Sequence, residues 1–338
     1  MPAKSRDQAV RKTRKAITRS DVARYAGVSD AVISYVLNGG PKPVADATRK
    51  RVLEAVAVLG YSPNAAARAL SRGTTDMIGM IVPDSRNPYF AELVYAVDSA
   101  AQEHGRTLLV INSDSRRSTA TDHIVGLASH QLDGLIVADM LTTSERALVT
   151  SLNIPVVLIN QFEGVGDVTS IGADYYEGAK SAVRHLIEHG HHRVAFIGGD
   201  PKIDRRERGW MDALSEAHLP LGPCYRVDFS LPGGHRAALE LAVNPRPATA
   251  VFIASDQLAV GAIAAFHARN LRIPEDIAVI SFDGSAESAY TWPPLTTVAQ
   301  PVTEMADEAV RLLLGRTIEV GFTTYPTSLI VRQSCGCP

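Results

Sequence analysis

The sequence predicts an α/β protein in which a small all-α module precedes a much larger body of two lobes, each a parallel sheet flanked by helices. Three observations lead to this prediction. The chain has 338 residues, more than one ordinary domain of roughly 100 to 200, and 46% of them are hydrophobic. Residues 1–76 hold 14 Lys and Arg against 6 Asp and Glu, whereas the remainder hold 20 against 30. After residue 76, short apolar runs alternate with amphipathic segments, which is typical of parallel sheets.

The N-terminal residues are basic throughout. Residues 1–16 have no apolar periodicity, so we expect a disordered basic arm. From Thr18 to Asp21 the spacing matches a capping box, and a first helix then ends at Gly27. The excess of Lys and Arg favours a polyanionic partner, because these side chains neutralise phosphates.

Two further helices complete a module at 17–61. The second covers 29–38, with Ser29 as its N-cap, and the third covers 45–59. Their expected buried positions are Val32, Ile33, Val36 and Leu37 in the second helix, and Val52, Leu53, Val56 and Leu59 in the third. A helix, a turn containing Gly and a second helix form the arrangement that reads DNA, although helical cores without DNA contain it too.

Residues 62–75 are predicted to form a hinge helix and linker. Pro63 suits the first position of a helix, and 64–70 are rich in helix formers but span only about two turns. Such a helix is marginal alone in water and needs a partner to fold. A plain Ala-rich linker is the alternative.

The body has two series of expected elements. In the first, strands at 77–82, 107–111, 134–137 and 155–159 are separated by helices near 88–104, 118–130 and 143–151. In the second, strands at 193–197, 250–254 and 277–281 accompany helices near 175–189, 205–217, 234–243 and 256–269. Ligands of such folds bind beyond the carboxyl ends of the strands, so a cleft between the lobes is the expected site.

The N-terminal module has a distinctive amino-acid sequence. Residues 21–29 (DVARYAGVS), 32–38 (VISYVLN), Thr48, Arg49 and 60–70 (GYSPNAAARAL) closely resemble the lactose/galactose repressor family, and the resemblance runs from Thr18 to the C-terminus. It implies a helix-turn-helix DNA-binding domain followed at 76–338 by a two-lobed, periplasmic-binding-protein-like effector and dimerisation domain of type I. The lobes are expected at about 76–174 with 301–320, and 175–300 with 321–338.

The resemblance implies roles for individual residues in DNA binding. Base-reading positions in the major groove are Asp30, Ala31, Ser34 and Tyr35, and backbone-contacting positions are Thr18, Ser29, Asn38, Thr48 and Tyr61. Family members usually have Arg at the position of Tyr35 and Ser or Thr at that of Ala45, so this chain departs from the pattern twice. In the hinge, Ala67 and Leu70 match minor-groove contacts, with Leu70 wedged into a central step.

A second set of residues is implied for the effector site. It comprises Tyr89, Phe90, Asn160, Asp174, Arg206, Phe229, Ser255 and Asp283, whereas Asp256 is interpreted as structural. Charged groups can bind a polyol bidentately while an aromatic ring packs on its C–H face, which suits a sugar or nucleoside-like effector. Alternatively, Tyr89 and Phe90 belong to the core, and Arg206 pairs with Asp204 or Glu207 on the surface.

Other functions fit less well. Residues 197–201 lack the spacing of a nucleotide-binding loop, and no nucleophile-elbow motif occurs, so we expect no enzyme and no cofactor. Cys335 and Cys337 have no ligand nearby in the sequence and are interpreted as a frayed, reduced tail. Three histidines, His189, His191 and His192, are interpreted as helix-end cations, so no metal is expected.

The absence of a run of about 18 apolar residues, and of a secretory signal, predicts a cytoplasmic protein with no membrane partner. The sequence therefore predicts a homodimeric transcriptional repressor that binds a near-palindromic double-stranded operator under the control of a small effector. The alternative is a soluble small-ligand-binding protein without operator binding.

Overall fold

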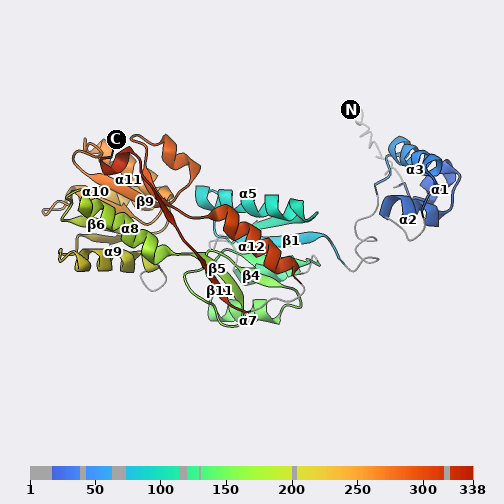
Figure 1. The fold of residues 1–338 in the computed structure, drawn as a ribbon, viewed down its shortest axis with the longest axis horizontal. Helices are drawn as coiled ribbons and strands as arrows, with labels where there is room; N and C mark the ends of the chain where they lie inside the picture. Colours follow the sequence, from blue (N-terminus) through green and yellow to red (C-terminus); the bar gives the residue numbers. More distant parts are fainter. Residues whose placement is uncertain are drawn as a thin grey trace, which may run out of the picture. The chain divides into compact units, whose positions relative to one another are not determined.

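The computed structural model describes residues 17–38, 43–62, 74–113, 120–128, 131–199, 204–315 and 320–337. The chain divides into two units between Thr75 and Asp76, each of which is considered by itself (Figure 1). The predicted basic arm at 1–16 and most of the predicted hinge, including Ala67 and Leu70, lie outside the described residues.

The first unit contains helices α1 (Arg19–Ala26), α2 (Asp30–Asn38) and α3 (Asp46–Leu59). The predicted capping box opens α1: Thr18 accepts from the Asp21 amide, and Asp21 accepts from the Thr18 amide at 2.9 Å. Gly27 ends α1 with φ +65°, a conformation that glycine adopts without strain. Each of the three predicted helices is therefore present, with ends that differ by at most one residue.

The core of this unit differs from the prediction at one position. Buried side chains include Val22, Ile33, Val36 and Val52. Leu53 was expected in the core, but 48% of it is exposed, and Ala55 is buried instead. Residues 52 and 55 lie on one face of α3, and residue 53 points about a quarter-turn away from Val52.

The second unit contains two six-stranded sheets. The first lobe has strands in the order β11-β5-β4-β3-β1-β2, and the second lobe has the order β12-β10-β9-β8-β6-β7. Neighbouring strands are parallel except for β10 and β12, which are antiparallel. The predicted fold class is thus observed.

The first lobe is built from β1 (Met77–Val82), β2 (Thr107–Asn112), β3 (Gly134–Val137), β4 (Val156–Leu158), β5 (Thr169–Ala173) and β11 (Phe322–Tyr325). Its helices are α5 (Pro88–Glu103), α6 (Ala120–Ala128), α7 (Thr143–Ser151) and α12 (Val302–Leu314). Helix α5 packs with α12, and α6 with α7, so the sheet is sandwiched between two helical pairs.

The second lobe is built from β6 (Val194–Gly198), β7 (Cys224–Arg226), β8 (Ala250–Ile253), β9 (Ala278–Asp283), β10 (Thr296–Ala299) and β12 (Ser328–Ile330). Its helices are α8 (Tyr175–Glu188), α9 (Arg205–Glu216), α10 (Leu231–Ala242) and α11 (Asp256–Ala268), with short 3-10 turns η1 (Ala286–Tyr290) and η2 (Gln333–Cys335). Helices α8 and α9 pack together, as do α10 and α11.

The last crossing between the lobes occurs later than predicted. The prediction assigned residues 321–338 to the second lobe, but β11 pairs with β5 of the first lobe, from Phe322 with Ser170 to Tyr325 with Ala173. Only after Tyr325 does the chain return to the second lobe, where β12 pairs with β10 (Figure 1). Two short strands, one for each sheet, therefore occupy a segment that was assigned to a single lobe.

Candidate functional site

A cavity of about 410 Å³ lies between the two lobes. We call it the interlobe pocket. Its walls include Ala138 after β3, Asn160 after β4, Gly199 after β6 and Asp283 at the end of β9. It therefore occupies the carboxyl ends of strands from both sheets, where parallel α/β folds place their ligands.

The charged centre of the interlobe pocket is Arg206, in the first turn of α9. Its Nε donates to Asp204 Oδ1 at 2.8 Å, and its Nη1 donates to the Ala254 carbonyl at 2.5 Å. Asp204 also caps α9 by accepting from the Arg206 amide. Burial opposes the charge, but the charge and hydrogen bond of Asp204 outweigh it and raise the pKa of Arg206. The guanidinium is thus fixed and positively charged.

Aromatic rings surround this guanidinium. The centroids of Phe162, Tyr175, Phe229 and Phe282 lie between 5.2 and 5.7 Å from Arg206 Cζ, within the range of cation–π attraction. Phe229 is 38% exposed and lines the pocket, so part of its ring is open to a ligand. The pocket therefore combines a fixed cation with apolar faces.

Two buried polar atoms of the pocket-lining residues have no hydrogen-bond partner among the residues that the structure describes. They are Oδ2 of Asp204 and Oε1 of Gln300. Buried polar atoms are nearly always paired in folded proteins, because an unpaired one costs roughly 1–3 kcal/mol. A ligand with several hydroxyl or amino groups would supply the missing partners.

Asp283 faces the same cavity from the second lobe. Its carboxylate accepts from Gln300 Nε2 at 3.0 Å and from the Asp256 amide at 3.3 Å. Burial, reinforced by the charge of Asp256, raises the pKa of Asp283 well above its ordinary value. The backbone of Asp283 has φ +123°, a conformation that residues other than glycine rarely adopt. Such backbone strain is concentrated at functional sites.

In the first unit, the predicted base-reading residues all belong to α2. Ala31 is exposed, whereas Asp30, Ser34 and Tyr35 are half-buried. The carboxylate of Asp30 accepts from Ser20 Oγ at 2.8 Å, so this residue also links α1 to α2. The predicted backbone-contacting residues are spread over the unit: Thr18 caps α1, Ser29 precedes α2, Asn38 ends it, Thr48 lies in α3 and Tyr61 follows α3.

Both units contain segments that match known protein families. Residues 18–64 match the model of the bacterial regulatory proteins of the lacI family, and residues 183–335 match a periplasmic binding protein-like domain. The chain is 37% identical over 336 residues to the HTH-type transcriptional repressor PurR of Erwinia tasmaniensis, covering 94% of this chain and 96% of that protein. The chain belongs to the lacI family.

Solved structures of similar proteins extend over both units. The lac repressor dimer bound to operator and the anti-inducer ONPF has a TM-score of 0.83 at 27% identity, covering 95% of this chain and 99% of the repressor. A complex of the transcriptional regulator CelR with cellobiose has a TM-score of 0.70 at 29% identity, covering 94% and 99%. This lacI-family chain is accordingly a DNA-binding transcriptional regulator with an effector-binding domain, and its predicted family, fold and class of function are confirmed.

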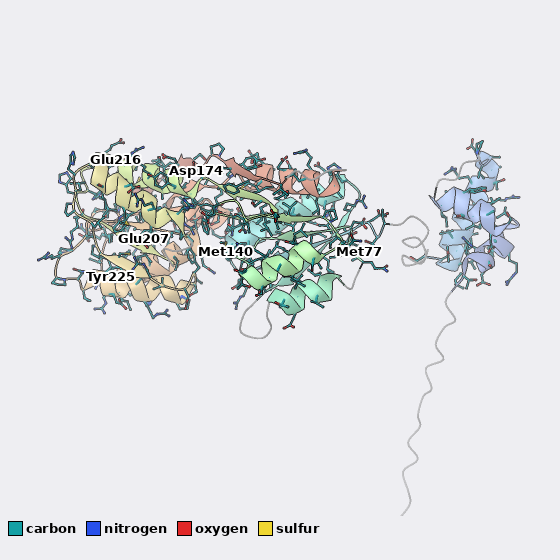
Figure 2. All side chains as sticks on the ribbon, turned by 90° about the horizontal axis from the view of Figure 1, so that it is seen from below. Met77, Met140, Asp174, Glu207, Glu216 and Tyr225 are labelled. Carbon is teal, nitrogen blue, oxygen red and sulfur yellow. The ribbon has the colours of Figure 1, made fainter. Side chains whose placement is uncertain are left out.

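Seven of the eight residues predicted for the effector site line the interlobe pocket of this lacI-family protein. They are Tyr89, Phe90, Asn160, Arg206, Phe229, Ser255 and Asp283. The eighth, Asp174, does not line this pocket: it caps α8, accepting from the Glu177 amide at 2.9 Å, and borders a separate hollow near Thr327. Figure 2 labels Asp174 and also Met140, which lines the pocket. The neighbouring Tyr175 approaches the pocket instead, donating to Asn160 Oδ1 at 2.7 Å.

The alternative surface role of Arg206 is also wrong, because the Arg206–Asp204 pair is buried inside the pocket. The interpretation of Asp256 is confirmed: its carboxylate accepts from Ser281, Thr297 and both the amide and hydroxyl of Ser285, all at 2.5 to 2.8 Å. It holds β9, β10 and the loop after β9 together.

The polar and aromatic pocket residues that were not predicted are Asn87, Asp139, Phe162, Asp204, Asp228 and Gln300. Asp139 follows β3 just as Asn160 follows β4, so the position of a polar residue directly after a buried strand could have indicated it. Gln300 gave no such signal, because its strand, β10, was not predicted.

The C-terminal Cys-x-Cys segment was predicted to be frayed, and this is wrong. Cys335 is buried in η2, and Cys337 is half-buried.

Of the three clustered histidines, His191 contacts Thr249 Oγ1 at 3.0 Å through Nδ1. Among the described residues, no helix is both long and apolar enough to cross a membrane.

Proposed function

We propose that this protein represses transcription as a homodimer on a near-palindromic operator, and that a sugar or nucleoside-like effector in the interlobe pocket controls operator affinity. The observation that carries the proposal is the pocket itself. Its buried Arg206–Asp204 pair, open aromatic face and two unpartnered polar atoms occur in a chain that also contains a helix-turn-helix unit.

The pocket chemistry supports a polyhydroxylated ligand. Arg206 presents a rigid fork of donors, and the free Oδ2 of Asp204 can accept from a hydroxyl. Together they can bind two adjacent hydroxyls, while Phe229 packs on the C–H face of a ring. The solved CelR complex with cellobiose, in a protein similar to this chain over both units, is consistent with a sugar.

The first unit supports base reading through α2. Asp30, Ala31, Ser34 and Tyr35 lie in the helix that would enter the major groove, and the backbone-contacting candidates Thr18, Ser29, Asn38, Thr48 and Tyr61 would position it on the phosphates. The similar lac repressor is a dimer bound to operator, which favours two copies of this chain reading the two halves of one site.

The two lobes are joined by contacts that ligand closure could alter. Glu92 of α5 accepts from the Ala286 amide at 2.6 Å, and Arg205 of α9 pairs with Glu163 after β4. A ligand that binds the closed lobes better shifts the protein toward that state. In this proposal closure biases the folding of the hinge at 62–75, where Ala67 and Leu70 contact the minor groove.

The proposal is tested by selecting bound duplexes from a random pool with the full-length protein and sequencing them. A repressor of this kind enriches one near-palindromic site. If no sequence is enriched while sugars or nucleosides still bind the protein, the chain is a ligand-binding protein without operator binding.

A further inference from the structure

Side chains from two segments that are far apart in the sequence converge in the second lobe, at the end of α8 and in η2. We propose that Cys335, Cys337, His185 and His189 form a binding site for a zinc-like divalent metal ion. The site is separate from the interlobe pocket, and it does not depend on the proposed effector or operator.

The distances between ligand atoms fit a metal ion. His185 Nε2 lies 3.4 Å from Cys335 Sγ and 3.6 Å from Cys337 Sγ, and Cys337 Sγ lies 3.4 Å from His189 Nε2. In tetrahedral zinc sites, metal–sulfur bonds of about 2.3 Å and metal–nitrogen bonds of about 2.05 Å place sulfur and nitrogen roughly 3.6 Å apart. The ligand atoms of His185, Cys335 and Cys337 all lie within 4.8 Å of one another, so three ligands are already gathered.

His189 supplies the fourth ligand. It follows α8 directly and lies four residues after His185, so both rings occupy the same side of the helix, with centroids 4.5 Å apart. The His-x₃-His spacing is the one found in Cys₂His₂ zinc sites. Because His189 is exposed, its ring can rotate toward the other three without disturbing the core.

The backbone holds the two thiols in place. Gly336, between the cysteines, has φ +97°, a conformation that favours glycine. Cys335 is fixed further because its sulfur accepts from Thr296 Oγ1 at 3.2 Å, a contact that would also orient a ligand thiolate. The segment returning from β12 thus brings Cys335 and Cys337 against the end of α8.

Two observations made from sequence were each correct and each incomplete. Cys335 and Cys337 have no ligand nearby in the chain, and the histidines beyond α8 have no cysteine nearby. The structure brings the two groups together across about 150 residues, with His185 in place of His191 and His192. Both sulfurs are thiols in the structure, and the same distances suit S–H to imidazole hydrogen bonds, so metal binding is the property to measure.

The test uses the reduced full-length protein after treatment with a chelator, with Zn²⁺ and Co²⁺ as probes. We expect one Zn²⁺ per chain to resist a competing chromophoric chelator, and Co²⁺ to give the intense visible bands and thiolate charge-transfer absorption of a tetrahedral sulfur site. Zn²⁺ should also raise the melting temperature, because it binds the folded state.

Variants assign the ligands. Cys337→Ser should abolish the thiolate charge-transfer band of a dithiolate site or reduce it to about half, and His189→Gln should weaken Zn²⁺ binding at least 10-fold. Both residues are at least partly exposed, and circular dichroism verifies that the variants fold. The matched controls are Cys224→Ser, at a half-buried thiol in β7, and His192→Gln, at an exposed histidine. Neither should change the spectrum.

Three results would overturn the proposal. The first is a reduced protein that retains no Zn²⁺ and gives no cobalt spectrum. The second is an unchanged spectrum in Cys337→Ser and His189→Gln. The third is mass spectrometry showing Cys335 cross-linked to Cys337 in the isolated protein, combined with no metal uptake after reduction.

Discussion

Arg206 donates to Asp204 Oδ1 at 2.8 Å inside the interlobe pocket, while the second carboxylate oxygen of Asp204 has no partner among the described residues. Arg206 is 6% exposed and Asp204 is 5% exposed, so solvent does not screen either charge effectively. The pair is therefore held in one geometry with one acceptor left over. This is the arrangement expected of a binding group that is organised before its ligand arrives.

Arg206→Lys should weaken effector binding without preventing the protein from folding. Lys retains the charge but loses the planar fork of donors and the contact with four rings, so we expect affinity for the effector to fall at least 10-fold. Isothermal titration calorimetry with a panel of sugars and nucleosides measures this. Arg208→Lys is the control, because Arg208 is exposed on the same helix and pairs with Asp212. Equal losses in both variants would refute the role of Arg206.

Asp256→Ala should be strongly destabilising. The carboxylate accepts four hydrogen bonds from β9, β10 and the loop after β9, and its loss leaves buried hydroxyl groups unpaired. We expect the free energy of unfolding of the second unit to fall by about 3–5 kcal/mol. Urea denaturation followed by circular dichroism gives the value. Asp276→Ala, which removes an exposed partner of Arg272, should lower it much less, and a comparable loss there would contradict the explanation.

Asp283→Asn should alter how stability depends on pH. Burial, with the charge of Asp256, raises the pKa of Asp283 in the folded protein, so folding favours the protonated carboxyl. Its contribution to stability is greatest below the unfolded pKa of 3.8 and is lost as pH rises toward the folded pKa. The stability gained by Asp283→Asn over wild type should therefore grow with pH through this window in urea denaturation.

Asp276→Asn provides a control of opposite sign. Its hydrogen bonds with Arg272 lower the pKa of Asp276 to about 2, so that its stabilising contribution is present above pH 3.8 and is lost as pH falls toward 2. A gain for Asp283→Asn that does not change with pH would show that its carboxyl does not titrate as the buried geometry requires.

The sequence predicted the strands whose apolar runs are buried on both faces, such as Met77–Val82 and Ala250–Ile253. It missed Thr169–Ala173, Thr296–Ala299 and Phe322–Tyr325, because these short strands lack a continuous run of large apolar residues and owe their conformation to pairing with neighbours far away in the chain. The error at residue 321 has the same origin: β11 joins the first sheet through β5, a strand that the sequence had not indicated.

The pocket was predicted through resemblance and the ends of strands, and this worked where a side chain projects from such an end, as with Asn160 and Asp283. Asp174 has the same kind of position, but it caps α8 and lies outside the residues that line the pocket. The Cys335, Cys337, His185 and His189 cluster could not be predicted, because no local pattern connects a turn at residue 335 with the end of a helix 150 residues earlier.

Tyr35→Arg should change which operator is preferred. Tyr35 lies on α2 among the proposed base-reading residues, and Arg can pair bidentately with guanine where Tyr cannot. Selection from random duplexes should then enrich guanine at one symmetric pair of positions, with a discrimination of about 1–3 kcal/mol. Tyr25→Arg is the control, since Tyr25 is exposed on α1 and the variant adds the same charge elsewhere in the unit. An identical operator preference in all three proteins would exclude Tyr35 from base reading.

Leu70→Ala tests the proposed hinge. If Leu70 wedges into a central minor-groove step, its truncation should reduce operator affinity at least 10-fold while leaving ligand affinity and the melting temperature unchanged. Fluorescence anisotropy with the selected operator measures the change. Leu53→Ala is the comparison, because Leu53 is largely exposed on α3 outside the proposed contacts. Unchanged binding by Leu70→Ala would rule out the wedge.

The central claim is that ligand in the interlobe pocket controls operator binding by the first unit. Its most direct test is an anisotropy titration of the selected operator with wild type and Arg206→Lys, each across a concentration series of the sugar or nucleoside that binds best. We expect the ligand to shift operator affinity in wild type, and Arg206→Lys to require at least 10-fold more ligand for the same shift. Operator affinity that stays constant at saturating ligand would contradict it.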